Sequence, residues 1–303
     1  MYHKILVGYD GSDQAQDALA LGKDLSQATG AELCVAGVSL IHPLLRGGTD
    51  PLDREGEPEF VAELERAAES VDAAARPVES SSPARGLHEL AAEIDADLIV
   101  VGSSRHGHLG QTLMGNVAVA LMHGSPCAVG IAPRGYCGRA DRGISTVVVG
   151  YDGSREAKLA LEDACELTRA SGASLKLVSV AQPPEIVIGK SGGANYGWEA
   201  VKETVEEQVR AQLEEARGAV PDDVEVEPIL ASGKPADELA ESAMRAGSVL
   251  MLGSRSYGPL RRVLLGSVSR VLADTAPAPL IVHPRGMHEE PKTAAAAEAG
   301  TTA

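Results

Sequence analysis

The sequence contains two copies of one domain pattern, and this repeat restricts the possible folds more than any other feature. The residues Gly-Tyr-Asp-Gly-Ser occur identically at 8–12 and 150–154, each time after a short apolar run. His88-Glu-Leu-Ala and Asp237-Glu-Leu-Ala follow in the same order, and Gly-Ser recurs at 102–103 and 253–254. Because the landmarks keep their order, both halves are predicted to build the same elements in the same sequence.

Within each half, short strand patterns alternate with longer helical patterns. In the first half the strand pattern 3–8 is followed by a helical pattern over 14–28, which Thr29-Gly30 ends. Strand patterns follow at 32–38, 77–79, 97–102 and 127–132, with helical patterns at 60–71, 87–94 and 113–123. This alternation predicts the α/β class: two tandem open parallel five-stranded sheets, Rossmann-like, with helices on both faces.

The repeat also predicts the domain boundaries. Domain 1 is expected over residues 1–135 and domain 2 over 144–286. Residues 136–143 are polar, rich in glycine and without periodicity, so they are predicted to be a linker. Residues 287–303 end in a run of Ala and Thr, and we expect a disordered tail there.

The charge balance restricts the partners of the chain. Its net charge is −16, from 27 Lys and Arg against 43 Asp and Glu, whereas nucleic acids and anionic membranes require a basic face. We therefore expect neither as a partner, although a small anionic ligand needs only local donors. No signal-peptide pattern and no apolar run of about 18 residues is found, so the expected location is the cytoplasm.

The cysteine and histidine spacing favours neither a metal site nor a catalytic site. The four cysteines include no CxxC pair; Cys34, Cys127 and Cys165 fit apolar patterns as small core residues, and Cys137 is expected to be exposed. His106 and His108 lack nearby Cys, Asp or Glu partners, which makes a poor ligand set. No nucleophile with a base, and no carboxylate pair, is evident. We expect no metal ligands and no catalytic residues.

The stretch 253–269 combines the features of a phosphate-binding turn. It follows the apolar run 249–252, carries small and basic residues, and reaches Gly266-Ser267 where a helical pattern begins. Backbone N–H groups of such a loop can approach a polyanion, and the helix N-terminus adds unpaired donors and partial positive charge. Glycine in a strand-to-helix turn also serves close packing, so the stretch by itself is equally consistent with a structural role.

Taken with the paired Asp-Gly-Ser turns, this loop resembles the universal stress protein family in its tandem two-domain form, over residues 1–135 and 143–286. Nucleotide-binding members of that family carry Gly, two residues, Gly, nine residues and Gly-Ser/Thr. The second half keeps this spacing as Gly253-x2-Ser256-x9-Gly266-Ser267, and the first half as Gly102-x2-Arg105-x9-Gly115-Asn116. The middle glycine is replaced in both halves. Ser256 is small and Arg105 is bulky, so domain 2 is predicted to be the main site.

The resemblance implies an adenine nucleotide, ATP with Mg²⁺, as the ligand. Asp10 and Asp152 would contact adenine or ribose, and Val38 and Val180 would meet adenine through their backbone; open parallel sheets do bind ligands beyond the carboxyl ends of their strands. The alternative for both aspartates is ordinary capping of a turn. The implied binding residues are Asp152, Val180, Gly253, Ser254, Arg255, Ser256, Gly258, Gly266, Ser267, Val268 and Ser269 in domain 2, and Asp10, Val38, Gly102, Arg105, Gly107, Gly115, Asn116 and Val117 in domain 1.

Three functions are consistent with these patterns. The first is a nucleotide-responsive stress protein that binds ATP chiefly in domain 2 and is not an enzyme, with the two domains paired within the chain and further dimerisation implied by the resemblance. The second is a scaffold or interaction module in which both loops are degenerate. The third, an adenylate-transferring enzyme, is the weakest because Ser191-Gly-Gly lies after strand two and not after strand one.

Overall fold

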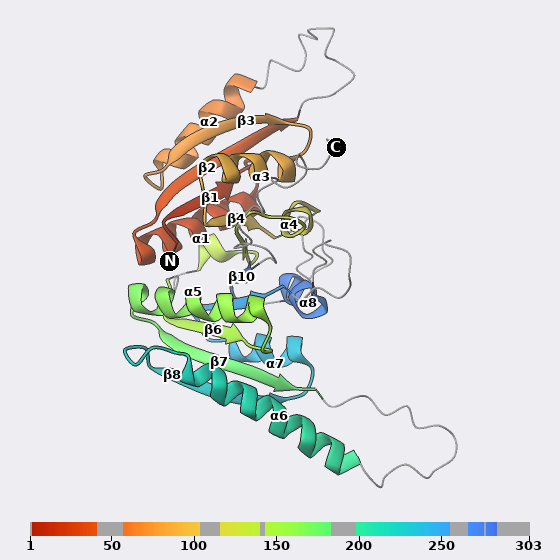
Figure 1. Cartoon of the computed structure of the whole chain (residues 1–303). Helices are drawn as coiled ribbons and strands as arrows, with labels where there is room; N and C mark the ends of the chain where they lie inside the picture. Colours follow the sequence, from red (N-terminus) through yellow and green to blue (C-terminus); the bar gives the residue numbers. More distant parts are fainter. Residues whose placement is uncertain are drawn as a thin grey trace, which may run out of the picture.

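The structure is a computed structural model that describes residues 2–40, 57–103, 116–139, 143–182, 198–254, 266–275 and 277–283. Strands and helices alternate through both halves, as the sequence predicts (Figure 1). The first half contains β1 (Lys4–Gly8), α1 (Asp13–Thr29), β2 (Glu32–Leu40), α2 (Glu57–Glu69), β3 (Ala74–Ser80), α3 (Pro83–Glu93), β4 (Leu98–Gly102), α4 (Asn116–Met122), β5 (Ala128–Ala132) and the 3-10 helix Tyr136–Gly138.

The second half repeats this order with one longer helix. It contains β6 (Thr146–Gly150), α5 (Arg155–Ser171), β7 (Ser174–Ala181), α6 (Trp198–Gly218), β8 (Val226–Ser232), α7 (Pro235–Ser242), β9 (Ser248–Gly253), α8 (Ser267–Thr275) and β10 (Leu280–His283). The predicted third strand, 77–79, was too short: β3 extends over seven residues because it pairs with β2 along its whole length.

The described strands form one ten-stranded sheet in the order β3-β2-β1-β4-β5-β10-β9-β6-β7-β8. Within each half all pairs are parallel, and β1 and β6 lie inside their halves, each next to the second and fourth strands. The halves join through one antiparallel pair, in which Ile281 of β10 lies opposite Gly130 of β5. The two predicted five-stranded sheets are therefore continuous, and the two domains are paired within the chain.

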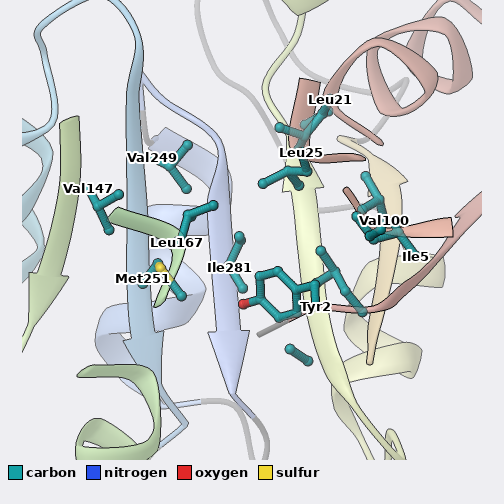
Figure 2. Packing of buried hydrophobic residues seen from close by; sticks show 14 of the residues in the cluster. Tyr2, Ile5, Leu21, Leu25, Val100, Val147, Leu167, Val249, Met251 and Ile281 are labelled. Carbon is teal, nitrogen blue, oxygen red and sulfur yellow. The ribbon is translucent and has the colours of Figure 1, made fainter. Parts of the chain in front are cut away.

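Both faces of this sheet are covered by helices, and each face has one apolar core that continues across the junction. Alternation along a strand sends Ile5 and Val7 of β1 to the core on the α1, α2, α5 and α6 side, and Leu6 to the core on the opposite side. At the junction, Tyr2 and Leu25 of the first half lie near Ile281 and Leu167 of the second (Figure 2). Burial of these shared side chains stabilises both halves together.

The helices that follow β1 and β6 begin and end with the same capping residues. Ser12 and Ser154 are N-cap residues whose side chains accept hydrogen bonds from Ala15 N and Ala157 N. Gly30 and Gly172 end the helices in the left-handed conformation, with φ of 73° and 69°. The repeated Asp-Gly-Ser sequence therefore acts first as a helix start.

The segment after β5 is held against α1 by a buried carboxylate. Asp17, which is 2% exposed, accepts hydrogen bonds from Gly135 N and Cys137 N, both at 2.8 Å. The Tyr136 hydroxyl donates to Asp24 at 2.8 Å, and Arg139 Nη1 donates to the Pro277 carbonyl of the second half at 2.9 Å. These contacts fix the start of the predicted linker to both halves. Cys137 is exposed and Cys34, Cys127 and Cys165 are buried, which confirms the predictions for the cysteines.

We predict that Asp17→Ala lowers the stability of the whole chain. Two backbone donors would lose a charged acceptor, and hydrogen bonds to charged groups contribute about 1.5–3 kcal/mol each at most. The free energy of unfolding, measured by urea denaturation, should fall by about 2 kcal/mol. Asp222→Ala, at an exposed position of the turn before β8, is the control and should change it by less than about 0.5 kcal/mol. Equal effects of the two substitutions would contradict the role given to Asp17.

Candidate functional site

A cavity of about 550 Å³ opens at the carboxyl ends of the strands of the second half. This volume is within the range of about 300–1,000 Å³ that is typical of small-molecule sites. Strand β6 lies between β7 and β9, so the connections that leave it and β9 pass to opposite faces of the sheet. Such a switch point is where open α/β sheets bind ligands. The lining residues are Gly150, Tyr151, Asp152, Val178, Val180, Gln182, Val205, Val209, Gln212, Pro235, Leu239, Leu252, Gly253, Gly266, Ser267, Val268 and Ser269.

The aspartate of the repeated turn lies at this cavity in the second half and also caps its own turn. Asp152 Oδ1 accepts a hydrogen bond from Ser154 N at 3.0 Å, and Asp10 Oδ1 accepts one from Ser12 N at 3.1 Å. The alternative given for these aspartates, capping of a turn, is therefore seen in both halves. A carboxylate can accept several hydrogen bonds, so capping by Asp152 is compatible with contact to a ligand.

Gly253 lines the cavity, but packing alone already requires a glycine there. A Cβ at this position would meet Ala157 N in the first turn of α5 at 2.5 Å. Its counterpart Gly102 is equally restricted, because a Cβ there would meet the Gln14 carbonyl of α1. The absence of a side chain at both strand ends therefore lets the helix after the first strand of each half pack closely against the end of the fourth.

The start of α8 forms the wall opposite the aspartate turn. Gly266, Ser267, Val268 and Ser269 all line the cavity, and Gly266 precedes the first helical residue. The first turn of an α-helix has backbone N–H groups without intrahelical acceptors and a partial positive charge. This arrangement supplies donors that favour an anionic group at this end of the cavity.

Two predicted residues of the second half occupy different positions relative to the cavity. Val180 lines it, and its side chain packs with the core on the α7 side. Ser254 differs from the prediction: it is 2% exposed and is not among the lining residues, because its N–H donates to the His283 carbonyl at 2.9 Å and holds it to β10. Arg255, Ser256 and Gly258 lie outside the described residues.

In the first half, Asp10, Val38 and Gly102 hold the positions that Asp152, Val180 and Gly253 hold in the second. Asn116 and Val117 begin α4, as Ser267 and Val268 begin α8. Arg105, Gly107 and Gly115 lie outside the described residues, as do His106 and His108.

Two larger or charged residues occupy the groove of the first half. The turn glycines Gly11 and Gly153 face Glu63 of α2 and Gln212 of α6, so these two side chains are equivalent. One helical turn earlier stand Phe60 and Val209. A Cβ on Gly37 of β2 would meet Phe60 Cζ at 2.6 Å, so the ring lies directly on the strand, and the Tyr9 hydroxyl donates to Glu63 at 3.2 Å. The first half thus places a ring and a carboxylate where the second has Val209 and Gln212.

The sequence analysis did not identify the α6 and α7 side of the cavity. Val205 and Val209 belong to the apolar stripe of α6, which indicates the side facing the sheet but not that part of it lines a cavity. Pro235 is the first residue of α7, with Lys234 as N-cap. Gln212 has no sequence signal; only its position opposite Gly153 brings it to the site.

The described residues contain no group of three His, Cys, Asp or Glu side chains that could hold a metal ion. Among the helices of the described ranges, none is long and apolar enough to cross a membrane.

The fold and the cavity define a class: tandem α/β proteins with a ligand crevice at the switch point of a parallel sheet. The family model of the universal stress proteins matches residues 1–133 and 143–284. The chain belongs to the universal stress protein family.

Relatives match this chain either along most of its length or over one half of it. Universal stress protein Rv2005c of Mycobacterium tuberculosis is 27% identical over 292 residues, covering 92% of this chain and 96% of the relative. A crystal structure of a universal stress protein from Archaeoglobus fulgidus superposes with a TM-score of 0.65 at 23% identity, over 94% of this chain and 100% of that one. A universal stress protein solved in complex with cAMP is 29% identical over 43% of this chain and 96% of its own length, with a TM-score of 0.33. The predicted family and fold class are confirmed.

We predict that Gly253→Ala and Gly102→Ala destabilise the protein in the absence of any ligand. Each Cβ would displace backbone of α5 or α1, and overpacking of this kind costs about 1–3 kcal/mol. Gly218→Ala is the control, since a Cβ there meets nothing within 4 Å and alanine favours a helix. Urea denaturation without nucleotide measures the three variants. Unchanged stability of both Gly253→Ala and Gly102→Ala would show that packing does not require these glycines.

Proposed function

We propose that this chain binds an adenine nucleotide, ATP with Mg²⁺, in the cavity of its second domain. In this proposal it acts as a nucleotide-responsive stress protein and not as an enzyme. The observation that carries the proposal is that Asp152, Val180, Gly253 and the residues Gly266–Ser269, expected from the sequence to bind the nucleotide, line one cavity of about 550 Å³.

The chemistry of the cavity walls fits the two ends of such a ligand. The apolar side chains Val178, Val180 and Leu239 offer surface to a base, and Asp152 offers acceptors to hydroxyl or amino groups. At the other end, the first turn of α8 offers backbone donors to phosphate. Mg²⁺ is proposed as the companion of the triphosphate, because it is usually bound through substrate phosphates and water and not by an all-protein cage.

The difference between the halves supports binding mainly in domain 2. Phe60 covers β2 in the first half, where Val209 leaves room in the second. Glu63 adds a negative charge beside the turn of the first half, whereas Gln212 in the second is neutral. A carboxylate at this position disfavours an anionic ligand, and a ring on the strand excludes a base.

The direct test is to denature the purified full chain, identify any released small molecule, and repeat thermal melting with ATP and Mg²⁺. A ligand present at 100 times its dissociation constant stabilises the folded state by about 2.7 kcal/mol, which should raise the melting temperature. Adenosine, which lacks the triphosphate, is the control and should stabilise the folded protein less than ATP. If no nucleotide is released and millimolar ATP leaves the melting curve unchanged, the scaffold function is the correct one.

We predict that Val209→Phe reduces ATP affinity by about tenfold or more. The substitution copies the residue of the first half into the open cavity, and a steric cost of about 1.4 kcal/mol corresponds to one factor of ten. Val201→Phe is the matched control, since Val201 lies on the same helix, is 43% exposed and does not line the cavity. Isothermal titration of both variants measures the effect. Wild-type affinity in Val209→Phe would place the binding site elsewhere.

A further inference from the structure

A second cavity, of about 310 Å³, lies in the second half between α5 and α6. Tyr151 lines both this cavity and the one at the switch point; the rest of the two linings differs. The lining residues are Tyr151, Lys158, Leu161, Glu162, Cys165, Glu166, Arg169, Glu215, Ala216, Ala219 and Pro221.

A small residue of the second half stands where a lysine side chain spans the equivalent helices of the first half. The repeated turn aligns Lys23 of α1 with Cys165 of α5, and the equivalence of Glu63 and Gln212 aligns Ser70 with Ala219. In the first half Lys23 Nζ reaches the Ser70 carbonyl at 3.5 Å and bridges the two helices. Cys165 has no amino group to donate, so it cannot make that bridge. The smaller Cys165 therefore leaves space between α5 and α6 in the second half.

The Tyr151 hydroxyl is the group that points to a ligand. Tyr151 is only 6% exposed, and within the described part of the chain nothing forms a hydrogen bond with its hydroxyl. The counterpart in the first half is Tyr9, whose hydroxyl has two hydrogen-bond partners. It accepts a hydrogen bond from Gln16 Nε2 at 2.8 Å and donates one to Glu63 at 3.2 Å. In the second half Lys158 and Gln212 replace these two partners. A hydroxyl that lines a cavity and has no partner among the described residues can form a hydrogen bond with a ligand there.

The charges around the cavity favour a cation. Three carboxylates line it, on Glu162, Glu166 and Glu215, against two basic residues. Arg169 is already neutralised, because its Nε and Nη2 donate to the two oxygens of Asp223 at 2.6 Å each. Lys158 Nζ lies 3.8 Å from Glu215, a loose pair between exposed groups. Among the exposed residues of the rim, Glu162 and Glu215 outnumber Lys158, so the charge there is negative without counting Glu166.

The floor of the cavity is apolar and neutral. Leu161 and Ala216 are buried there, and Pro221 and the ring of Tyr151 complete it. Burial raises the pKa of the Cys165 thiol to about 11, so this side chain remains uncharged at pH 7 and adds to the apolar surface. Burial, with Glu215 and Asp152 nearby, also raises the pKa of Tyr151, so its hydroxyl stays protonated.

We propose that this cavity is a second binding site, for a small molecule with an apolar body and one ammonium group. The body packs between Leu161, Ala216 and the Tyr151 ring. The ammonium group donates hydrogen bonds to the Tyr151 oxygen and to the Glu215 carboxylate. The volume, at the low end of the range for ligand sites, limits the body to about the size of one aromatic ring. This site is independent of whether nucleotide binds in the first cavity.

The probe for this site is 2-phenylethylamine, added to the full chain without nucleotide. Isothermal titration should give saturable binding of one equivalent with a dissociation constant of about 1 mM or lower, as expected for a ligand of this size. The charge-reversed probe 3-phenylpropionate has a similar body and should bind at least fivefold more weakly, about the effect of the rim charges. Binding that does not saturate, or equal binding of both probes, would overturn the proposal.

Variants locate the bound probe. Ala219→Trp fills the cavity from its exposed rim and should abolish binding, whereas Ala211→Trp, exposed on the same helix and outside the lining, should leave it unchanged. Tyr151→Phe should weaken 2-phenylethylamine by about tenfold, because it removes a hydrogen bond to a charged group, and should leave 3-phenylpropionate unaffected. Circular dichroism melting confirms that each variant is folded. Unchanged binding in both Ala219→Trp and Tyr151→Phe would exclude this cavity as the site.

Discussion

The arrangement of the two domains depends on three residue pairs between β5 and β10. This antiparallel pair joins two parallel sheets into one, and it covers one strand edge of each half, β5 and β10, that would otherwise be unpaired. Gly130 stands opposite Ile281 at the middle of the pair, so a small residue faces a large one. Helices α1 and α5 then pack against each other across the junction, and one core continues under both halves. β3 and β8 remain as the outer edges of the joined sheet.

The two copies of the fold share their structural residues but differ in the helix that covers the strand ends. The strand ends keep the same glycines in both halves because the following helices pack on them, and the turns keep the same aspartates because they cap the same helices. The residues that differ lie on α2 and α6, which cover the groove. Phe60 and Glu63 lie against β2 and the turn in one half; Val209 and Gln212 line a cavity in the other. Structural requirements therefore preserve the motif in both halves, while the side chains of the covering helix differ between them.

The family resemblance was readable from the sequence because its residues lie in short segments with fixed spacing. The turn at 150–154 and the loop ends at 253 and 266 are local features, and the structure brings their described residues to one cavity. Ser254 shows the limit of this reasoning. It belongs to the motif by position, yet its backbone bonds to β10, a partner that the spacing of one loop does not reveal. Gln212 and Pro235 reach the cavity from helices that carry no motif.

The sequence by itself determined the repeat, the α/β alternation, the helix caps and the family, because each depends on neighbours close along the chain. Tertiary structure alone decided that the two sheets become one, that Asp17 fixes the segment after β5, and that the cavities lie in the second half. The physical reason is that these features depend on contacts between groups more than 100 residues apart, most of them involving the backbone, or on the volume left between helices. Asp17 and Cys137 are 120 residues apart, and no local pattern pairs them.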